Sequence, residues 1–397
     1  MNIGVIVDNE YNNDKRVERE AGILKDAGHS VYVLCFGFGG KSYPGQEGIE
    51  ISRIRINRKL KDILFFFQNR LPAYEKLWSR RISRFIKEKN LGFLHVHDLY
   101  MSKAASEGIR CSGKKVSMVL DLHENYPYAV TSYNWSRGLV RNFLARPNLW
   151  QKKEREYLSY ADKIIVLSED YRDVLTEKYP ELLPGRFGII PNVPDIRVWQ
   201  KGNEVPAKAN VREGTTVVLY FGVIAERRGV FDVLEVYSEL AAERFPSVFL
   251  VIGPVDKRDR KRFFSLIKSP DLRDNVHYVP PVGFNELPSY LDISDICLAP
   301  FHRNPQHESG IANKIFDYLL GKKPVIVSDC KPQKRLVEKY ACGLVYSDNK
   351  GMKEAIRELS ANPGMRIRMG ENGFRAVTEE LNSDMIRKPL ADLFSNV

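Results

Sequence analysis

The sequence lacks several features that would each place it in a particular class of protein. Its runs of aliphatic and aromatic residues, such as that from Ile63 to Phe67, are far shorter than the roughly 18 residues that a membrane-spanning helix needs. Its five cysteines are scattered and form no C-x-x-C pair, which argues against a disulfide scaffold and against a zinc site. We therefore expect a cytoplasmic chain that does not itself cross a membrane.

A motif for a divalent metal is also missing. The sequence contains no D-x-D triplet that could hold a metal ion on a diphosphate. Its E-x-E triplets at 18–20 and 154–156 fall in helical stretches, where alternating residues do not share a face. We predict that no metal takes part in the chemistry, and that protein groups neutralise any diphosphate.

What the sequence does have is the composition of a folded, basic protein. Apolar residues make up 43% and charged residues 28% of 397 positions, and 61 Lys and Arg outnumber 50 Asp and Glu by 11. These proportions are typical of globular domains, and a chain of this length is expected to form two of them. The opening residues, Met1 to Asp8, predict a buried strand rather than a signal peptide, because no basic region precedes the apolar residues.

Short apolar runs alternate with longer amphipathic segments along both halves of the chain. Such alternation predicts parallel sheets with helices on both faces. The predicted strands are at 3–7, 31–36, 93–97, 116–122 and 163–167 in the first half, and at 216–221, 247–252, 276–279, 295–299 and 324–327 in the second. The segment 191–213 between the halves contains three prolines and no clear period, so we interpret it as a linker.

The predicted fold class is therefore α/β, with two doubly wound, Rossmann-like domains that face a cleft. We place these domains at 1–195 and 196–375, and we expect 376–397 to form a helix that packs back toward the first domain. Open α/β sheets bind ligands outside the carboxyl ends of their strands. The loops that follow the strands are therefore the places to look for a site.

One loop of the second domain has the pattern of an anion-binding site. It runs from Gly222 to Gly229, follows an apolar strand and leads into a predicted helix, whose first backbone N–H groups suit an anion. Arg227 and Arg228 add cations with bidentate geometry for phosphate oxygens. The alternative is an ordinary turn between a strand and a helix, with two solvated arginines.

A second loop repeats the pattern. It follows Pro300 and leads into a predicted helix at 313–320, so that backbone N–H groups again lie at a helix start, at Gly310, Ile311 and Ala312. Lys314 adds a cation, and Asp317 supplies a carboxylate that can accept hydroxyl groups of a ribose. Taken alone, Asp317 is more easily explained as an acid on a helix surface.

These segments resemble the large family 4 group of glycosyltransferases, which have the GT-B fold. The stretch Ser309 to Ser328 is similar to the family segment with two glutamates separated by seven residues and followed by G-x-P-V-I, and Gly222 to Gly229 is similar to its G-R-x4-K-G loop. Residues 14–21 and 190–195 resemble its first helix and its interdomain segment. The resemblance covers nearly the whole chain. It implies metal-independent transfer with retention from a nucleotide-diphosphate sugar of the UDP or GDP type, with no other cofactor.

The resemblance also implies a donor site, with some departures from the family pattern. Asp317 stands for the second glutamate, Arg228 for the Lys, and Val223 for the Arg, so that Arg227 would supply the missing cation. Ser309 stands where the first glutamate is expected, and the neighbouring Glu308 could serve through a shift of one residue. Arg228 and Glu308 are expected to act in catalysis, within a donor-binding set of Gly222, Arg227, Arg228, Ser309, Gly310, Ile311, Ala312, Lys314 and Asp317.

Two strands of the first domain end in histidines and acids. In the resembled family, a His after the corresponding strand contacts the donor sugar or the reacting centre, and His123 matches it best, which makes it a third catalytic candidate. Histidines at strand ends are also common as caps or core residues, which is the alternative for both His123 and His97. We expect the acceptor side to be lined by Asn12, Asn13, Asp14, His97, Asp98 and Glu124.

Residues 53–89 carry most of the basic excess. They hold twelve Lys or Arg against three acids, a local balance of +9, interleaved with apolar residues such as Trp78 and the run from Ile63 to Phe67. Such a segment suits anionic lipid headgroups, so we predict peripheral binding at the inner face of the cell membrane. Nucleic acid is the weaker alternative, because no helix-turn-helix, finger or RNA-binding aromatic motif is present. A second alternative is a helix whose phenylalanines pack on the sheet and whose basic face is exposed to water.

The leading hypothesis is a glycosyltransferase that moves a sugar to a lipid-linked or polysaccharide acceptor, in the synthesis of a cell-surface glycan such as capsule, lipopolysaccharide or exopolysaccharide. A nucleotide-sugar epimerase on the same fold is a second hypothesis, and it would need no acceptor surface. A catalytically silent homologue that binds a partner is the third, because Val223 and Ser309 stand at motif positions.

Overall fold

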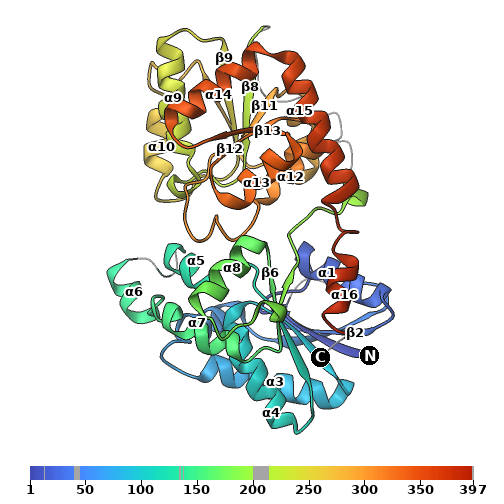
Figure 1. Ribbon diagram of the computed structural model, residues 1–397. Coiled ribbons are helices and arrows are strands. Elements are labelled where there is room, and N and C mark those ends of the chain that lie inside the picture. Colours follow the sequence, from blue (N-terminus) through green and yellow to red (C-terminus); the bar gives the residue numbers. More distant parts are fainter. Residues whose placement is uncertain (13, 40–44, 134–135, 137, 200–213, 396–397) are drawn as a thin grey trace. The chain divides into compact units, whose positions relative to one another are not determined.

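The computed structural model describes residues 1–12, 14–39, 45–133, 136, 138–199 and 214–395 (Figure 1). The chain forms two compact units, the first made of Met1–Asn192 with Asp384–Val397 and the second of Val193–Ser383. The sequence predicted boundaries at 195/196 and 375/376. In the structure, residues 193–195 and 376–383 lie in the second unit instead. The backbone N–H of Ser383 donates to the carbonyl of Pro194 and holds these two crossing segments together within the second unit.

The first unit contains a seven-stranded parallel sheet in the order β3-β2-β1-β4-β5-β6-β7. Its strands are β1 (Asn2–Ile6), β2 (Ser30–Gly37), β3 (Ile49–Arg55), β4 (Phe93–His97), β5 (Ser117–Asp121), β6 (Lys163–Val166) and β7 (Phe187–Ile189). The two strands that the sequence did not predict, β3 and β7, are the edges of this sheet. Edge strands are only half covered, so they do not need the continuous apolar run that marks the inner ones.

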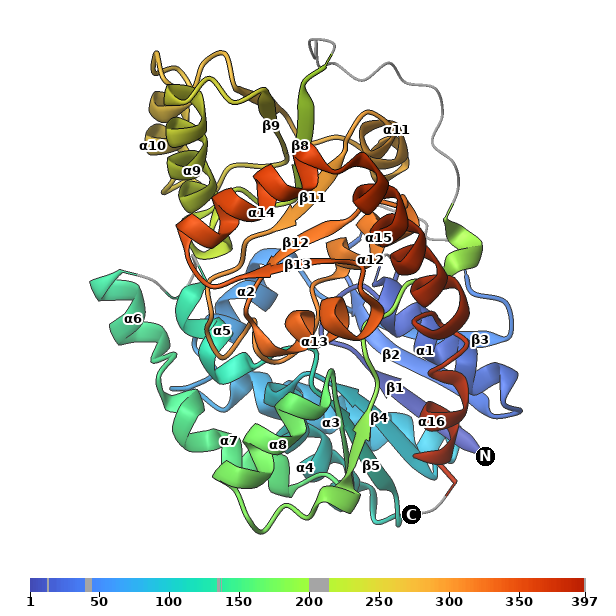
Figure 2. The ribbon, with the colours of Figure 1, turned by 45° about the horizontal axis from the view of Figure 1, so that its top comes forward.

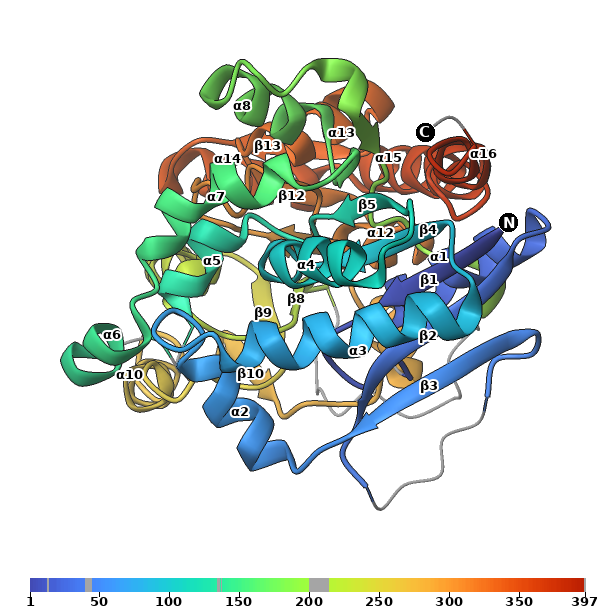
Figure 3. The same ribbon diagram turned by 90° about the horizontal axis from the view of Figure 1, so that it is seen from below.

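Helices cover both faces of this sheet, and two of them, α3 and α4, lie side by side across one face (Figure 3). The helices of the first unit are α1 (Lys15–Asp26), α2 (Arg58–Phe66), α3 (Ala73–Lys89), α4 (Ser102–Ser112), α5 (Tyr126–Ser132), α6 (Leu139–Ala145), α7 (Leu149–Ser159), α8 (Glu169–Lys178) and α16 (Arg387–Asp392). The last of these packs against α1 and β7, where Arg387 forms an ion pair with Asp26.

The basic segment 53–89 is therefore not one helical stretch, because it comprises the end of β3, then α2, then α3. Trp78, which the sequence analysis grouped with the lipid-facing side chains of this segment, lies fully buried in the core beside Phe36. Trp78 is buried because α3 is amphipathic. Seven of the seventeen residues of α3 are buried, at the spacing that turns one face of a helix toward a sheet.

The second unit contains a six-stranded parallel sheet in the order β10-β9-β8-β11-β12-β13. Its strands are β8 (Thr216–Phe221), β9 (Ser247–Ile252), β10 (Val276–Val279), β11 (Ile296–Ala299), β12 (Val325–Ser328) and β13 (Gly343–Tyr346). Five of these were predicted, and the one missed, β13, is again an edge. Strand order reverses between β8 and β11, which places the ligand crevice of such a sheet at the carboxyl ends of these two strands.

The helices of the second unit are α9 (Val230–Ala242), α10 (Arg260–Leu266), α11 (Leu287–Asp292), α12 (Asn313–Leu320), α13 (Lys331–Tyr340), α14 (Asn349–Ala361) and α15 (Pro363–Arg375). Figure 2 shows α9 and α14 beside each other, joined by ion pairs such as that between Lys353 and Glu239. Among all the helices that the structure describes in either unit, none is both long and apolar enough to cross a membrane.

Candidate functional site

In the second unit, the loops after β8 and β11 meet through a glycine. Gly229 has a φ of 71° and lies at the N-terminus of α9. A Cβ atom at this position would overlap the carbonyl oxygen of Pro300. Only glycine combines this left-handed conformation with so close an approach of two backbones. The short helical turn Glu226–Arg228, which carries both predicted arginines, is thereby held against the start of the other loop.

Two cations converge on one aromatic ring at this meeting point. The guanidinium carbon of Arg228 lies 5.2 Å from the centre of the Phe301 ring, and Nζ of Lys314 lies 5.3 Å from it. The same Nζ is 3.6 Å from the centre of the Tyr220 ring. Burial and the nearby Arg228 hold the pKa of Lys314 well below its usual range. Like charges brought together out of water favour an anion as the ligand.

The start of α12 and its carboxylate complete this group. Ala312 precedes the helix in an extended conformation and makes no side-chain cap bond, and the N-terminus of such a helix suits an anion. Asp317 lies one turn further along, and burial raises its pKa to about 7 despite the opposing effect of Lys314. Arg228, Lys314 and Asp317, predicted from the sequence, are thus brought together. Gly222 joins them, because a Cβ there would lie 2.8 Å from Nζ of Lys314.

The structure gives Glu308 other partners. Its Oε1 accepts a hydrogen bond of 2.8 Å from Nε of Arg303, and its Oε2 accepts one of 2.9 Å from the backbone N–H of Lys331, the first residue of α13. Ser309 is buried and donates to the carbonyl of Gln306. These bonds brace the loop after β11 and occupy both carboxylate oxygens that the sequence analysis assigned to catalysis.

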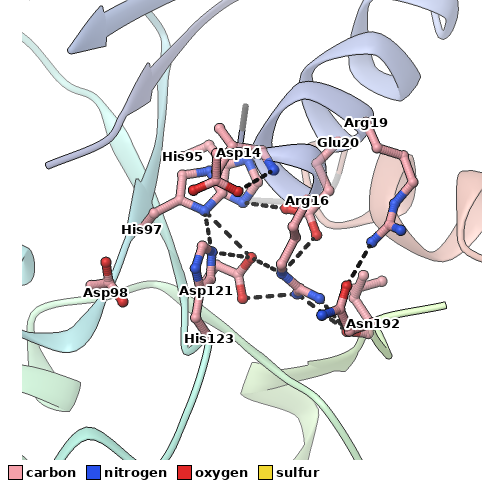
Figure 4. Close-up of polar contacts among 12 residues, drawn as sticks. Asp14, Arg16, Arg19, Glu20, His95, His97, Asp98, Asp121, His123 and Asn192 are labelled. Carbon is pink, nitrogen blue, oxygen red and sulfur yellow. Dashed lines mark hydrogen bonds and ion pairs between the residues drawn. The ribbon is translucent and has the colours of Figure 1, made fainter. Parts of the chain in front are cut away.

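In the first unit, a buried network of charges lies at the carboxyl ends of β4 and β5 (Figure 4). Arg16, on α1, donates two hydrogen bonds of 3.0 Å to Asp121, one to each carboxylate oxygen. It also forms an ion pair of 3.1 Å with Glu20 and bonds to the carbonyl of Ile190. Burial alone would raise the pKa of Asp121, but Arg16 and His123 hold it well below its usual range.

His123 is joined to this network at its solvent side. Its Nε2 lies 3.4 Å from Oδ2 of Asp121 and 2.8 Å from Nδ1 of His97, and 21% of its side chain is exposed. Burial opposes its charge, but Asp121 offsets that effect and raises the pKa of His123 to about 9. Burial lowers the pKa of His97. The protonated His123 therefore donates to a neutral His97 and places a positive charge at the carboxyl end of β5.

Four buried groups of this network have the chemistry of metal ligands. Single ligand atoms of Glu20, His95, His97 and Asp121 all lie within 4.8 Å of one another. A cation is already present, however, because the guanidinium of Arg16 contacts both carboxylates. We therefore interpret the group as an ion-pair network. That no metal takes part stays a prediction from the sequence.

Asp98 follows β4 with a backbone conformation that is rare for any residue but glycine. Its φ is 73° and its ψ is 136°. Its Oδ2 accepts a hydrogen bond of 3.0 Å from the hydroxyl of Tyr100, and burial raises its pKa to about 6. A strained conformation of this kind costs about 1–3 kcal/mol and persists only where the surroundings impose it.

This strain gives a testable difference between two substitutions. Asp98→Gly is expected to be more stable than Asp98→Ala by about 1 kcal/mol, because both lose the carboxylate but only glycine adopts the backbone conformation without strain. Glycine is ordinarily the less stable of the two residues, so the order itself is diagnostic. Urea unfolding of both variants measures it. An alanine variant that equals or exceeds the glycine variant in stability means that Asp98 is not strained.

The structure gives the other described residues predicted for the acceptor side hydrogen-bond partners within the first unit. Asp14 accepts a hydrogen bond from the backbone N–H of Val17 and caps α1. Asn12 accepts one from Arg53, and Glu124 accepts one from the hydroxyl of Tyr133. Asn13 lies outside the described residues.

Four residues that support the predicted ones were not predicted from the sequence. Phe301 and Tyr220 contact the two cations, Asp121 contacts His123, and Arg16 holds Asp121 in place. A signal in the sequence was present for two of these four. Phe301 directly follows the strand-ending Pro300, and Asp121 lies two residues before His123 at the end of a strand.

Comparison with protein families identifies both units. Residues 16–197 match the model described as Glycosyltransferase Family 4, and residues 202–376 match the one described as Glycosyl transferases group 1. The chain belongs to the family 4 glycosyltransferases. Its fold agrees with this assignment to the GT-B class, as the sequence predicted.

Solved glycosyltransferases share this fold along the whole chain. A sucrose-phosphate synthase from Thermosynechococcus elongatus matches with a TM-score of 0.74 at 16% identity, over 100% of this chain and 98% of that one. Anabaena HepE in complex with UDP matches with a TM-score of 0.70 at 13% identity, over 100% of both chains. At these identities the likeness establishes the fold alone.

The match to a curated relative covers a smaller part of both chains. The Bacillus subtilis protein TuaH, named as a glycosyltransferase of teichuronic acid biosynthesis, is 21% identical over 240 residues, which are 56% of this chain and 58% of that one. This family 4 member therefore spans little more than half the length of that curated relative.

Proposed function

We propose that this family 4 glycosyltransferase transfers a sugar, with retention and without a metal ion, from a nucleotide-diphosphate sugar to a lipid-linked or polysaccharide acceptor of the cell surface. The observation that carries the proposal is the convergence of Arg228 and Lys314 on Phe301 beside Asp317. In this arrangement two cations, a helix start and a carboxylate match the charges and hydroxyl groups of a nucleotide diphosphate.

The proposed reaction breaks the bond between the anomeric carbon and the diphosphate oxygen and forms a bond from that carbon to an acceptor hydroxyl oxygen, whose proton passes to the departing diphosphate. Negative charge develops on the departing diphosphate, and Arg228, Lys314 and the N-terminus of α12 are the groups that stabilise it. Asp317 binds ribose hydroxyls. His123, kept protonated by Asp121, donates a hydrogen bond to a sugar hydroxyl.

Two further details of the proposal concern the partners. UDP is the first nucleotide to test, because the structure of HepE contains it, and GDP is the second. A cell-surface acceptor is supported by the pathway in the name of TuaH. With such an acceptor, the transferase would act at the inner face of the cell membrane, where the basic segment 53–89 would contact anionic lipid.

An assay of nucleotide release tests the function. The protein is incubated with UDP- and GDP-sugars, with and without acceptor glycolipid, and in the presence and absence of EDTA. Release that rises with acceptor and survives EDTA is expected, and the anomeric coupling constant of the product reports retention. Loss of activity in EDTA with rescue by manganese contradicts the metal-free mechanism. Conversion of the donor sugar without release of nucleotide indicates the epimerase instead.

Asp317→Ala is expected to weaken UDP binding by about 10- to 100-fold, because a hydrogen bond to a charged group contributes about 1.5–3 kcal/mol. Isothermal titration calorimetry with UDP measures the affinity. Glu371→Ala is the matched control, since this exposed carboxylate of the same unit pairs only with Lys322 among the contacts that the structure records for it. Equal UDP affinity in the Asp317 variant and the wild type excludes the ribose assignment.

A further inference from the structure

Helix α6 presents apolar side chains to solvent. Leu139, Val140 and Phe143 are 94%, 71% and 68% exposed. Leu139 and Phe143 are four residues apart and therefore lie on one face of the helix. Figures 1 and 3 show α6 at the periphery of the first unit. Solvated faces of helices are normally polar, so an apolar face of this size indicates an interaction surface.

Helix α2 adds a second apolar surface of the same kind. None of its nine residues is buried. Two of them, Leu60 and Ile63, are apolar and yet exposed. Leu64 and Phe65 pack against the core, so the helix is attached by one side only. An open groove of about 590 Å³ lies beside it, lined by Lys61, Asp62, Ile63, Phe65, Phe66, Phe67 and Arg141.

The two helices form one surface because the connection between α2 and α3 binds the end of α6. Arg70 donates hydrogen bonds to the carbonyls of Phe143 and Leu144, and its guanidinium lies 4.9 Å from the centre of the Phe143 ring. Asn69 donates to the carbonyl of Ala145. The groove beside α2 is also lined by Arg141 of α6. We name this surface the α2/α6 platform and define it by six exposed apolar residues: Leu60, Ile63, Leu71, Leu139, Val140 and Phe143.

The charge around the platform selects its partner. Residues 58–71 and 139–146 together hold six Lys or Arg, namely Arg58, Lys59, Lys61, Arg70, Arg141 and Arg146, against the single acid Asp62, a balance of +5. Exposed apolar side chains among cations fit an anionic bilayer, where the cations meet headgroup phosphates and the apolar groups enter the acyl region. A protein partner would need its own acidic rim around an apolar centre to match.

We propose that the α2/α6 platform inserts into anionic membranes and is the surface by which this glycosyltransferase reaches a lipid-linked acceptor. The proposal rests on the proposed function for the acceptor, but it differs from the contact predicted from the sequence. It adds α6, which lies outside the segment 53–89, and it leaves out α3. The exposed arginines of α3, at 80, 81 and 84, lie on a helix whose large apolar side chains are buried apart from the half-buried Leu77, and Arg84 pairs with Glu88.

Vesicle co-sedimentation tests the platform. The wild type is expected to bind vesicles of phosphatidylglycerol and phosphatidylcholine, and to bind pure phosphatidylcholine vesicles at least tenfold more weakly. The variant Leu139→Ser/Val140→Ser/Phe143→Ser is expected to lose at least tenfold in affinity for the anionic vesicles without unfolding, since these side chains are exposed. The matched control, Arg80→Gln/Arg81→Gln/Arg84→Gln, removes three cations from α3 and is expected to change that affinity by less than threefold.

A second measurement reports insertion itself. A Phe143→Trp variant is expected to show a blue shift of its added emission with anionic vesicles, relative to the wild type. The proposal is overturned if the serine variant binds as the wild type does, if the α3 variant loses more affinity than the serine variant, or if the added tryptophan does not shift. It is also overturned if sedimentation velocity shows that the serine substitutions dissociate a dimer that does not bind vesicles.

UDP binding by calorimetry is measured on the same samples and separates this proposal from the proposed function. A protein that inserts through the platform but binds no nucleotide retains the membrane surface and loses the transferase assignment. A protein that binds UDP and releases it from a donor sugar, but does not co-sediment with vesicles, supports the proposed function and contradicts the platform.

Discussion

Arg228→Ala is expected to lower kcat/KM for glycosyl transfer by about 10²- to 10³-fold, corresponding to about 2.7–4 kcal/mol of transition-state stabilisation. Arg228 lies over Phe301 beside Lys314, in a turn that Gly229 holds in place. Its charge is therefore positioned before the diphosphate leaves, which is the condition under which such a group is most effective.

The controls separate charge from position. Arg228→Lys keeps the charge but loses the planar fork, so it should recover part of the activity. Arg273→Ala removes an exposed arginine of the same unit that pairs with Asp274, and should leave kcat/KM unchanged. Thermal unfolding of all three variants shows whether the fold is intact. Full activity in a folded Arg228→Ala protein would exclude the residue from leaving-group stabilisation.

The inner part of the fold could be predicted from the sequence because buried parallel strands are nearly continuous apolar runs. The runs at 216–221 and 247–252 coincide with the inner strands β8 and β9, and the run at 276–279 coincides with β10, an edge strand that was predicted as well. The strands that were missed, β3, β7 and β13, each lie at an edge of a sheet. Their residues are covered on fewer sides, so local sequence does not distinguish them from loops.

The grouping of candidate residues could be predicted where they are close in sequence. Arg228 and Gly229 belong to one loop, and Lys314 and Asp317 to one helix, and the structure places Arg228 and Lys314 beside the same ring. Glu308 was also chosen by its place in a motif, yet both its oxygens bind Arg303 and Lys331 in the structure. A sequence position cannot reveal such a competing partner.

The network behind His123 could not be predicted for a different reason. Arg16 and Glu20 are charged residues four apart on a helix, a pattern that usually marks a solvated face. Both are buried, because the guanidinium of Arg16 pairs with the carboxylate of Glu20 and with that of Asp121, on a strand more than a hundred residues away. The resemblance at residues 14–21 predicted the first helix, but the register that places His97 beside Asp121 is a property of the assembled sheet.

Asp121→Asn is expected to destabilise the protein by about 3–5 kcal/mol, because it leaves the buried guanidinium of Arg16 without its bidentate partner. Urea unfolding of the full chain measures the change. The double variant Arg16→Met/Asp121→Asn removes the stranded charge as well, so it should be more stable than the single one. If the double variant loses the sum of both single effects, the two residues are not coupled.

The same substitution should change how stability depends on pH. In the wild type, burial opposes the charge of His123, but Asp121 raises its pKa from the ordinary value of 6.5 to about 9. The folded state therefore binds more protons between these values, and this contribution is complete below about pH 6.5 and is lost as the pH rises through 9. Glu20, whose pKa burial also raises, acts in the same direction.

Stability of the wild type should accordingly fall between pH 6.5 and 9, by at most about 1.4 kcal/mol per pH unit for each proton. Without the Asp121 carboxylate, burial and Arg16 both favour neutral His123, so its pKa should drop below 6.5 and its part of this slope should vanish. Urea unfolding at pH 6.5, 7.5 and 8.5 measures the slope, and NMR titration of the His123 ring measures the pKa directly. An unchanged pKa in the Asn variant would mean that another group, rather than Asp121, keeps His123 protonated.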